Sequence, residues 1–418
     1  MSDHLSSMNF VVFAERTGNL APERLRSALN TLQSENLLLQ TRIGWNDAQG
    51  LYFEHAPANS IALQCQPVSA DNWQTPIEAE FSRPFALGTA PLMRCIYLQQ
   101  PERCVLALSF HHAIADGRAG IALLRQLLSL LAADAAMPPK ANAAALPAMI
   151  DLMPPHFRWA EQPEAAKQLK AALINDYRRH GAPATLPWLD STNSARSPKF
   201  IRLTLNPDLT AQLIERARQH RTSVHGVLCA AQLMAQSALQ TDGAATTFLL
   251  SSPVDMRAHL EPAPPASPAG LFVSIISATF PVDAQTQVWP LAQDIVRQTR
   301  LQISRGEGHL FYNMFGLDGT PVLPERMNAF HKKLQASLHN TMISNVGLVA
   351  DIEDDPAVEA ISFALCPMPY QALFTAASTY RGQLILNVGF DAAKLAPSDA
   401  RTLTERIHEV LHLATRGD

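Results

Sequence analysis

The sequence predicts an α/β or α+β protein of two lobes, each a mixed β-sheet backed by helices. Its length of 418 residues exceeds what one ordinary hydrophobic core holds, so two lobes of roughly 200 residues are expected. A short strand followed by an amphipathic helix also occurs twice, starting near residues 9 and 200. This repeat favours two lobes of similar design.

The two strand–helix openings can be followed along the chain. Residues 9–14 form an apolar run, Gly18 marks a turn, and Pro22 suits a first helical turn, where its missing N–H costs nothing. In the second opening, residues 200–205 alternate like a half-buried strand, and an Asn-Pro pair then caps and starts a helix. Each strand is therefore expected to lead directly into a helix.

Two further strands, residues 92–98 and 104–110, are predicted to form a hairpin because a polar five-residue turn joins them. The sequence HHAIADG follows at residues 111–117, and after it a helix with an apolar face. The paired histidines therefore lie where a buried strand ends and a loop begins. A strand end fixes the position of a functional group, and a loop leaves it accessible.

The lobe boundary is expected near residue 190. Residues 138–187 are rich in Ala and Pro and have no clean period apart from a helix near 164–177, which is typical of a connecting segment. We therefore assign residues 1–190 to the N-terminal lobe, with the crossover segment 138–190 included, and residues 191–418 to the C-terminal lobe. In the C-terminal lobe, strands are predicted at 247–251, 273–280 and 384–389, and a last helix at 397–413.

The composition excludes several classes of protein. The net charge is −4 and the isoelectric point about 6.4, without the Lys/Arg-rich stripe expected of a nucleic-acid-binding protein. No apolar run approaches the ~18 residues needed to span a bilayer, and the N-terminus lacks a signal-peptide pattern. Five scattered cysteines without a CxxC pair are typical of free thiols in a reducing compartment. We expect a cytoplasmic monomer.

The residues after the hairpin offer a base for acyl transfer. An alcohol or amine that attacks a thioester loses a proton, and an imidazole, with an ordinary pKa of about 6.5, can accept it at neutral pH. His112 supplies the imidazole, Asp116 a carboxylate four residues on, and Gly117 a tight turn beside them. A metal site including His111 is the alternative by residue type. We expect no metal, because adjacent strand residues point to opposite faces and no third ligand is evident.

The segment HHxxxDG resembles the signature of the condensation-domain and polyketide-associated acyltransferase superfamily, of which chloramphenicol acetyltransferase is a distant relative. Free-standing polyketide-associated acyltransferases match best in length. Leu271 stands where the family commonly has Asn, and the DFGWG segment of plant acyltransferases is absent. Further segments resemble the family in its own order: residues 25–43, 81–98, PVDMR at 253–257, GLFVS at 270–274 and SNVG at 344–347.

The resemblance implies a fold of two chloramphenicol acetyltransferase-like lobes in a V, with an active-site tunnel at their interface. It implies that His112 is the catalytic base. It further implies that Asp116 is structural and pairs with Arg257, and that Gly117 keeps the tunnel open beside the histidine.

The remaining candidates have supporting roles. His111 is expected to hold the loop by hydrogen bonding. Ser344 and Asn345 are candidates for lining the tunnel or donating hydrogen bonds to an oxyanion, although a packed position in a sheet is the commoner case for such residues.

The resulting hypothesis is an acyltransferase that transfers groups other than aminoacyl groups. It moves an acyl group from an acyl carrier protein or CoA thioester to a small hydroxyl acceptor and needs no further cofactor. An amine acceptor, which would give an amide, is one alternative. A catalytically silent homologue that binds a carrier protein or a lipid is another, and the intact HHxxxDG segment argues against it.

Overall fold

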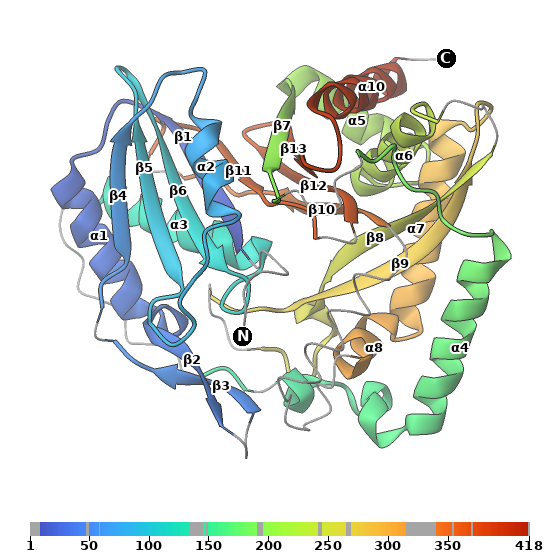
Figure 1. Ribbon diagram of the computed structural model, residues 1–418, viewed down its shortest axis with the longest axis horizontal. Helices are drawn as coiled ribbons and strands as arrows, with labels where there is room; N and C mark the ends of the chain where they lie inside the picture. Colours follow the sequence, from blue (N-terminus) through green and yellow to red (C-terminus); the bar gives the residue numbers. More distant parts are fainter. Residues whose placement is uncertain are drawn as a thin grey trace.

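In the computed structural model, the described part of the chain comprises residues 9–46, 50–57, 59–133, 145–147, 149–189, 195–240, 245–264, 269–314, 340–352, 355–368 and 371–416. Two mixed β-sheets, each backed by helices, lie side by side (Figure 1). The α/β fold of two lobes with mixed sheets, which the sequence predicts, is therefore confirmed.

The first lobe is built on a five-stranded sheet in the order β11-β1-β6-β5-β4. Neighbouring strands are antiparallel except β4 and β5, which are parallel. Helices α1 and α3 pack on one face of this sheet and α2 on the other. The elements are β1 (Asn9–Thr17), α1 (Pro22–Glu35), β4 (Ala62–Pro67), α2 (Gln74–Glu80), β5 (Met93–Gln99), β6 (Arg103–His111), α3 (Gly117–Ala132) and β11 (Val358–Ala364).

The second lobe is built on a six-stranded sheet in the order β7-β13-β12-β10-β8-β9. Helices α5, α6, α7 and α10 bury their apolar faces against one side of it. The elements are β7 (Pro198–Leu205), α5 (Pro207–Gln219), α6 (Val224–Ser237), β8 (Thr246–Asp255), β9 (Val273–Val282), α7 (Val288–Ser304), α8 (Glu307–Met314), β10 (Asn340–Leu348), β12 (Gln371–Tyr380), β13 (Gln383–Asp391) and α10 (Pro397–Thr415).

Two smaller parts complete the described chain. The connection between the lobes contains α4 (Pro163–Arg179), where the sequence predicts a helix near 164–177. A separate two-stranded sheet is formed by β2 (Thr41–Asn46) and β3 (Gly50–His55). This hairpin was not predicted, and neither of its strands joins a main sheet.

Strand β11 belongs to the first sheet although it lies late in the chain. It pairs antiparallel with β1, and side chains of the second sheet hold its other edge. Asn387 Nδ2 donates to the carbonyl of Phe363 at 2.8 Å, and Ser378 Oγ donates to that of Ile361 at 3.0 Å. The first sheet is thus drawn from both sides of residue 190, which the expected lobes 1–190 and 191–418 did not foresee.

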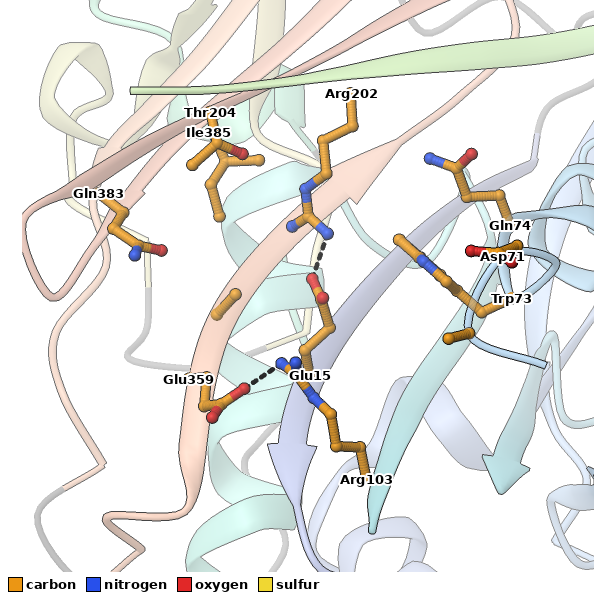
Figure 2. A pocket seen from close by; sticks show the side chains of 12 residues that line it. Glu15, Asp71, Trp73, Gln74, Arg103, Arg202, Thr204, Glu359, Gln383 and Ile385 are labelled. Carbon is orange, nitrogen blue, oxygen red and sulfur yellow. Dashed lines mark hydrogen bonds and ion pairs between the residues drawn. The ribbon is translucent and has the colours of Figure 1, made fainter. Parts of the chain in front are cut away.

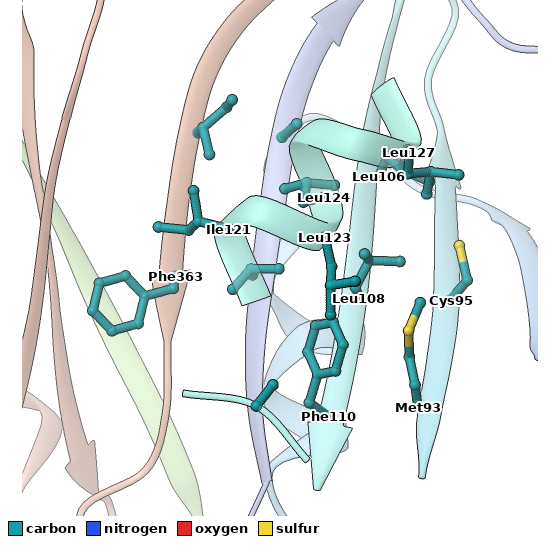
Figure 3. Packing of buried hydrophobic residues seen from close by; sticks show 14 of the residues in the cluster. Met93, Cys95, Leu106, Leu108, Phe110, Ile121, Leu123, Leu124, Leu127 and Phe363 are labelled. Atoms are coloured by element: carbon teal, nitrogen blue, oxygen red, sulfur yellow. The ribbon is translucent and has the colours of Figure 1, made fainter. Parts of the chain in front are cut away.

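The core of the first lobe forms where α3 lies across the sheet (Figure 3). Alternate residues of β6, including Leu108 and Phe110, point toward α3 and are fully buried. Gly120 lets the helix approach closely, because a Cβ there would lie 2.8 Å from Phe10 Cε2 and 2.9 Å from Val12 Cγ1. This contact seats the first turn of α3, and the HHxxxDG segment before it, on β1.

We predict that Gly120→Val destabilises the protein by about 1–3 kcal/mol, because the added methyl groups overpack the contact with Phe10 and Val12. Unfolding in urea, followed by circular dichroism, measures the change. Gly88→Val is the matched control, since a Cβ at Gly88 meets no atom within 4 Å. Equal loss of stability in both variants would contradict the close-packing role of Gly120.

Candidate active site

The HHxxxDG segment connects the last residue of β6 to the first residue of α3. His111 ends β6, and Asp116 is the N-cap of α3, which begins at Gly117. The peptide N–H of His111 donates to the carbonyl of Leu92 at 3.0 Å. Both ends of the segment are therefore fixed by secondary structure, and the two imidazoles between them have defined surroundings.

His111 is a buried, neutral histidine. Its Nδ1 accepts the N–H of Ala113 at 3.2 Å, so the ring proton lies on Nε2. The edge of its ring meets the face of Phe85, with the centroids 6.2 Å apart. Burial lowers the pKa of His111 to about 4. A neutral ring that accepts a loop N–H fits the supporting role implied by the resemblance.

A buried ion pair lies next to Phe85, the residue that contacts His111. The guanidinium of Arg94 lies 3.7 Å from the centre of the Phe85 ring and donates to Glu80 through Nε at 2.7 Å. Arg94 also donates to the carbonyls of Arg83 and Pro84. These contacts hold Phe85 against His111. Sequence analysis did not identify this pair, because the two residues are 14 positions apart on different elements.

His112 faces a different environment. It is half-buried, and its ring packs against Phe10 of β1 with centroids 4.9 Å apart. Burial lowers the pKa of His112 below its ordinary value, and outweighs both the opposing charge of the Asp116 carboxylate and hydrogen bonding to the backbone. The imidazole is therefore neutral at pH 7, the state that a general base requires.

Asp116 is buried, accepts two hydrogen bonds and forms an ion pair. Oδ1 accepts the N–H of Ala119 at 2.9 Å, which caps α3. Oδ2 accepts the N–H of Phe272 at 2.9 Å and lies 3.0 Å from Nη2 of Arg257. The contact between Asp116 and Arg257 that the resemblance implies is present, and it joins the two lobes.

The ion pair extends further than the sequence indicates. Nη1 of Arg257 lies 3.0 Å from Oδ1 of Asp255, and Oδ2 of Asp255 lies 3.4 Å from Nε of Arg118. The Arg257 guanidinium also lies over the ring of Phe272, 4.8 Å from its centre. Charges therefore alternate from Asp116 to Arg118. Asp255 lies inside the PVDMR segment, so this segment is the part of the sequence that could have indicated the longer chain of ion pairs.

The segment before β9 is pinned to the HHxxxDG turn through its backbone. The N–H of Gly270 donates to the carbonyl of Ile114 at 3.0 Å, and the N–H of Asp116 donates to the carbonyl of Gly270 at 3.1 Å. Gly270 has φ +146°, and a Cβ there would lie 2.5 Å from the ring of Phe272. Only glycine fits. Because these bonds use the main chain, they do not depend on the Asn that Leu271 replaces.

Gly117 lies where the two sheets meet, and its role beside a tunnel stays a prediction. A Cβ at Gly117 would lie 3.4 Å from Val346 Cγ1 and 3.5 Å from Phe363 Cε2. Ser344 precedes Val346 by two residues on β10 and so shares its face of the strand. Asn345 Oδ1 accepts the N–H of Gly347 at 2.8 Å, where the pairing with β12 shifts register. Ser344 is thus better placed than Asn345, and an oxyanion role for either stays a prediction.

A cavity of about 740 Å³ lies elsewhere between the lobes (Figure 2). It is lined by Glu15 and Arg103 of the first sheet and by Arg202 and Gln383 of the second, among others. Arg103 begins β6 and His111 ends it, so the cavity lies at the opposite end of that strand from His112. It is not the tunnel implied by the resemblance, which stays a prediction.

Within the described stretches, no group of three or more His, Cys, Asp or Glu side chains could hold a metal ion. Among the helices of those stretches, none is long and apolar enough to cross a membrane.

Comparisons with known proteins find a matching family and chains of similar sequence. Residues 194–388 match the family described as "Phthiocerol/phthiodiolone dimycocerosyl transferase C-terminus". The chain is 25% identical over 280 residues to "Tyrocidine synthase 3" of Brevibacillus parabrevis, a match that covers 65% of this chain and 4% of that protein. The C-terminal part of the chain is thus similar to this transferase family, and a larger part is similar to a synthase of the condensation-domain type.

Solved structures of the superfamily share the fold over nearly the whole chain. Polyketide synthase associated protein 5 from Mycobacterium tuberculosis aligns with a TM-score of 0.66 at 17% identity, covering 99% of this chain and 97% of that one. Trichothecene 15-O-acetyltransferase from Fusarium sporotrichioides aligns with a TM-score of 0.72 at 13% identity, covering 98% of this chain and 92% of that one. The first condensation domain of the CDA synthetase aligns with a TM-score of 0.72 at 14% identity, covering 99% of this chain and 92% of that one.

We predict that Asp116→Ala and Arg257→Ala each lower the free energy of unfolding by about 3–5 kcal/mol. Arg257→Ala leaves the buried Asp116 carboxylate without its cation, and Asp116→Ala removes the cap of α3 and the acceptor of the Phe272 N–H as well as the ion pair. The double variant should lose much less than the sum of the two. Urea unfolding of the four proteins gives the coupling. Arg257→Lys is the control: it keeps the charge but not the fork that contacts Asp116 and Asp255, so we expect partial loss. Additive effects would show that the pair does not act as a unit.

Stability should also depend on pH through His111. Its folded pKa of about 4 lies below the ordinary 6.5, so between these values the unfolded chain binds a proton that the folded chain does not. The stability from this group is complete above pH 6.5 and is lost as pH falls toward 4. We predict that between pH 7 and pH 5 the wild type loses about 2 kcal/mol more than His111→Gln does. Equal losses in urea unfolding would contradict this.

Proposed function

We propose that the protein moves an acyl group from a thioester of CoA or an acyl carrier protein to a hydroxyl acceptor, with His112 as the general base. The observation that carries the proposal is the state of His112: a neutral imidazole at the end of β6, next to the buried pair of Asp116 and Arg257. Asp116 accepts two backbone N–H groups and pairs with Arg257, so it orients the turn and does not carry protons.

The proposed reaction needs one proton to move twice. The imidazole of His112 takes the proton of the acceptor hydroxyl as the oxygen attacks the thioester carbonyl. A C–O bond forms and the carbonyl oxygen becomes an oxyanion, for which the Ser344 hydroxyl is a candidate donor. Collapse of this intermediate breaks the C–S bond, and the departing thiolate takes the proton back from the imidazolium. The products are an ester and a free thiol.

One observation favours an oxygen acceptor over nitrogen: a structure with the same fold is an O-acetyltransferase by name. The alternative, an amine acceptor that yields an amide, is favoured by the likeness to a condensation domain. The ester-forming and the amide-forming reaction use the same base, so only the identity of the acceptor distinguishes them. A silent binding homologue would not need a neutral histidine in this position.

The proposal is tested with a panel of acyl-CoA thioesters and release of free CoA as the readout. We predict that His112→Ala lowers the rate of acyl transfer, or of slow thioester hydrolysis, by about 10²–10⁴-fold, because a positioned general base is lost. The variant should unfold at nearly the wild-type urea concentration, since His112 is only half-buried. Near-wild-type turnover by His112→Ala would overturn the assignment of the base.

The pH dependence gives a second readout of the same group. A base must be deprotonated, so kcat/KM should rise with pH through the pKa of His112 and then level off. Because burial lowers that pKa below 6.5, we predict that the midpoint of the rise lies below pH 6.5. A rise centred above pH 7 would assign the titration to another group.

A further inference from the structure

We propose that the β2–β3 hairpin docks this protein on a lipid bilayer through one apolar face. This inference does not rest on the proposed reaction. The face consists of Ile43 and Trp45 of β2 and Leu51 and Phe53 of β3, and we call it the hairpin face. In the register of the hairpin, Ile43 is opposite Phe53 and Trp45 is opposite Leu51. Paired residues share a face, so the four side chains form one surface.

The hairpin face gathers three of the nine large apolar side chains that are exposed in the described part of the chain. The exposed fractions are 43% for Trp45, 38% for Leu51 and 48% for Phe53. Only Ile43, at the base, packs against the core of the first lobe. Figure 1 shows the hairpin extending from the lower edge of that lobe, away from both main sheets. The aromatic side chains are therefore held away from the body of the protein, where folding alone does not require them.

The opposite face of the hairpin is polar and internally satisfied. Arg42 and Glu54 form a two-point ion pair across it, with distances of 3.0 and 2.9 Å. The Tyr52 ring fills the space beside Gly44, where a Cβ would lie 2.6 Å from it. The hairpin is thus an amphipathic ribbon with one partnered face and one unpartnered face.

Area and charge decide what covers the hairpin face. Large aromatic side chains bury about 150–250 Å² each, so three half-exposed apolar residues offer on the order of 300 Å². A stable dimer needs about 800 Å² per partner, which argues against a second copy of the chain. The face carries no charge, and its neighbour Arg42 is paired with Glu54, so an acidic carrier protein finds no free cation there.

A bilayer surface fits these features. Trp and other amphipathic rings favour the boundary between headgroups and acyl chains. From Ile43 to Asn46, where β2 ends, the strand rises about 10 Å, a length comparable to the ~5–10 Å depth of interfacial insertion. The hairpin is also tied to the catalytic end of the first lobe, because the N–H of Ile43 donates to the carbonyl of Leu87 at 2.8 Å. Leu87 is two residues from Phe85, which contacts His111.

Flotation with phosphatidylcholine vesicles tests the proposal on the full chain. Wild-type protein should float with the vesicles, and Trp45→Thr/Phe53→Thr should float at least about tenfold less. Threonine keeps the strand propensity. The matched control, Ile214→Gln/Leu413→Gln, removes two other exposed apolar side chains, 41% and 64% exposed, and should float like wild type. Absence of wild-type flotation, or equal flotation of all three proteins, would overturn the proposal.

Two further measurements keep the result unambiguous. Brominated phosphatidylcholine should quench tryptophan emission of the wild type more than that of Trp45→Phe, which retains the apolar face. Equal quenching would overturn the placement of Trp45 in the bilayer. Light scattering that gives twice the chain mass for wild type, and the chain mass for Trp45→Thr/Phe53→Thr, would replace the bilayer with a second copy.

Failure of this proposal is separable from failure of the proposed reaction. The hairpin variant should release CoA from a short-chain acyl-CoA at the wild-type rate, and His112→Ala should float like wild type. Loss of CoA release in the hairpin variant would place the hairpin in the reaction itself and overturn a docking role.

Discussion

One buried carboxylate constrains most of this structure. The Asp116 carboxylate is buried away from solvent, and an uncompensated charge in that position would cost free energy of folding. Its oxygens are satisfied by the start of α3, by the N–H of Phe272, and by Arg257 after β8. Each donor comes from a different part of the chain. The carboxylate can be buried only when both lobes are in place, so it couples the helix start, the segment before β9 and the lobe interface.

The same arrangement explains how two adjacent histidines differ. His111 ends a strand and rests on Phe85, which Arg94 and Glu80 support from behind. His112 lies past the strand end, against Phe10. The charge of the Asp116 carboxylate favours the protonated form of His112, but burial outweighs it, and the imidazole stays neutral.

Local patterns predicted much of the fold and the order of its parts. Apolar spacing and proline position placed the helices after β1 and β7, and the polar turn placed the β5–β6 hairpin. The partners of Arg257 beyond Asp116, and the pair of Arg94 and Glu80, depend on long-range packing that has no local signature. The return of β11 to the first sheet is a similar case, because a strand's periodicity shows which face is buried but not which neighbour it pairs with.

The position of β11 has a consequence for biosynthesis. β1 leaves the ribosome well before the strand that covers its edge, which is completed only at residue 364. At translation rates of about 5–20 residues per second, roughly 20 to 70 s pass between the two. During that interval the nascent first lobe presents an open edge that can pair with another chain. Chaperone engagement of the ribosome-bound chain would matter most in this window, and the lobe can complete its sheet only after most of the second lobe has been synthesised.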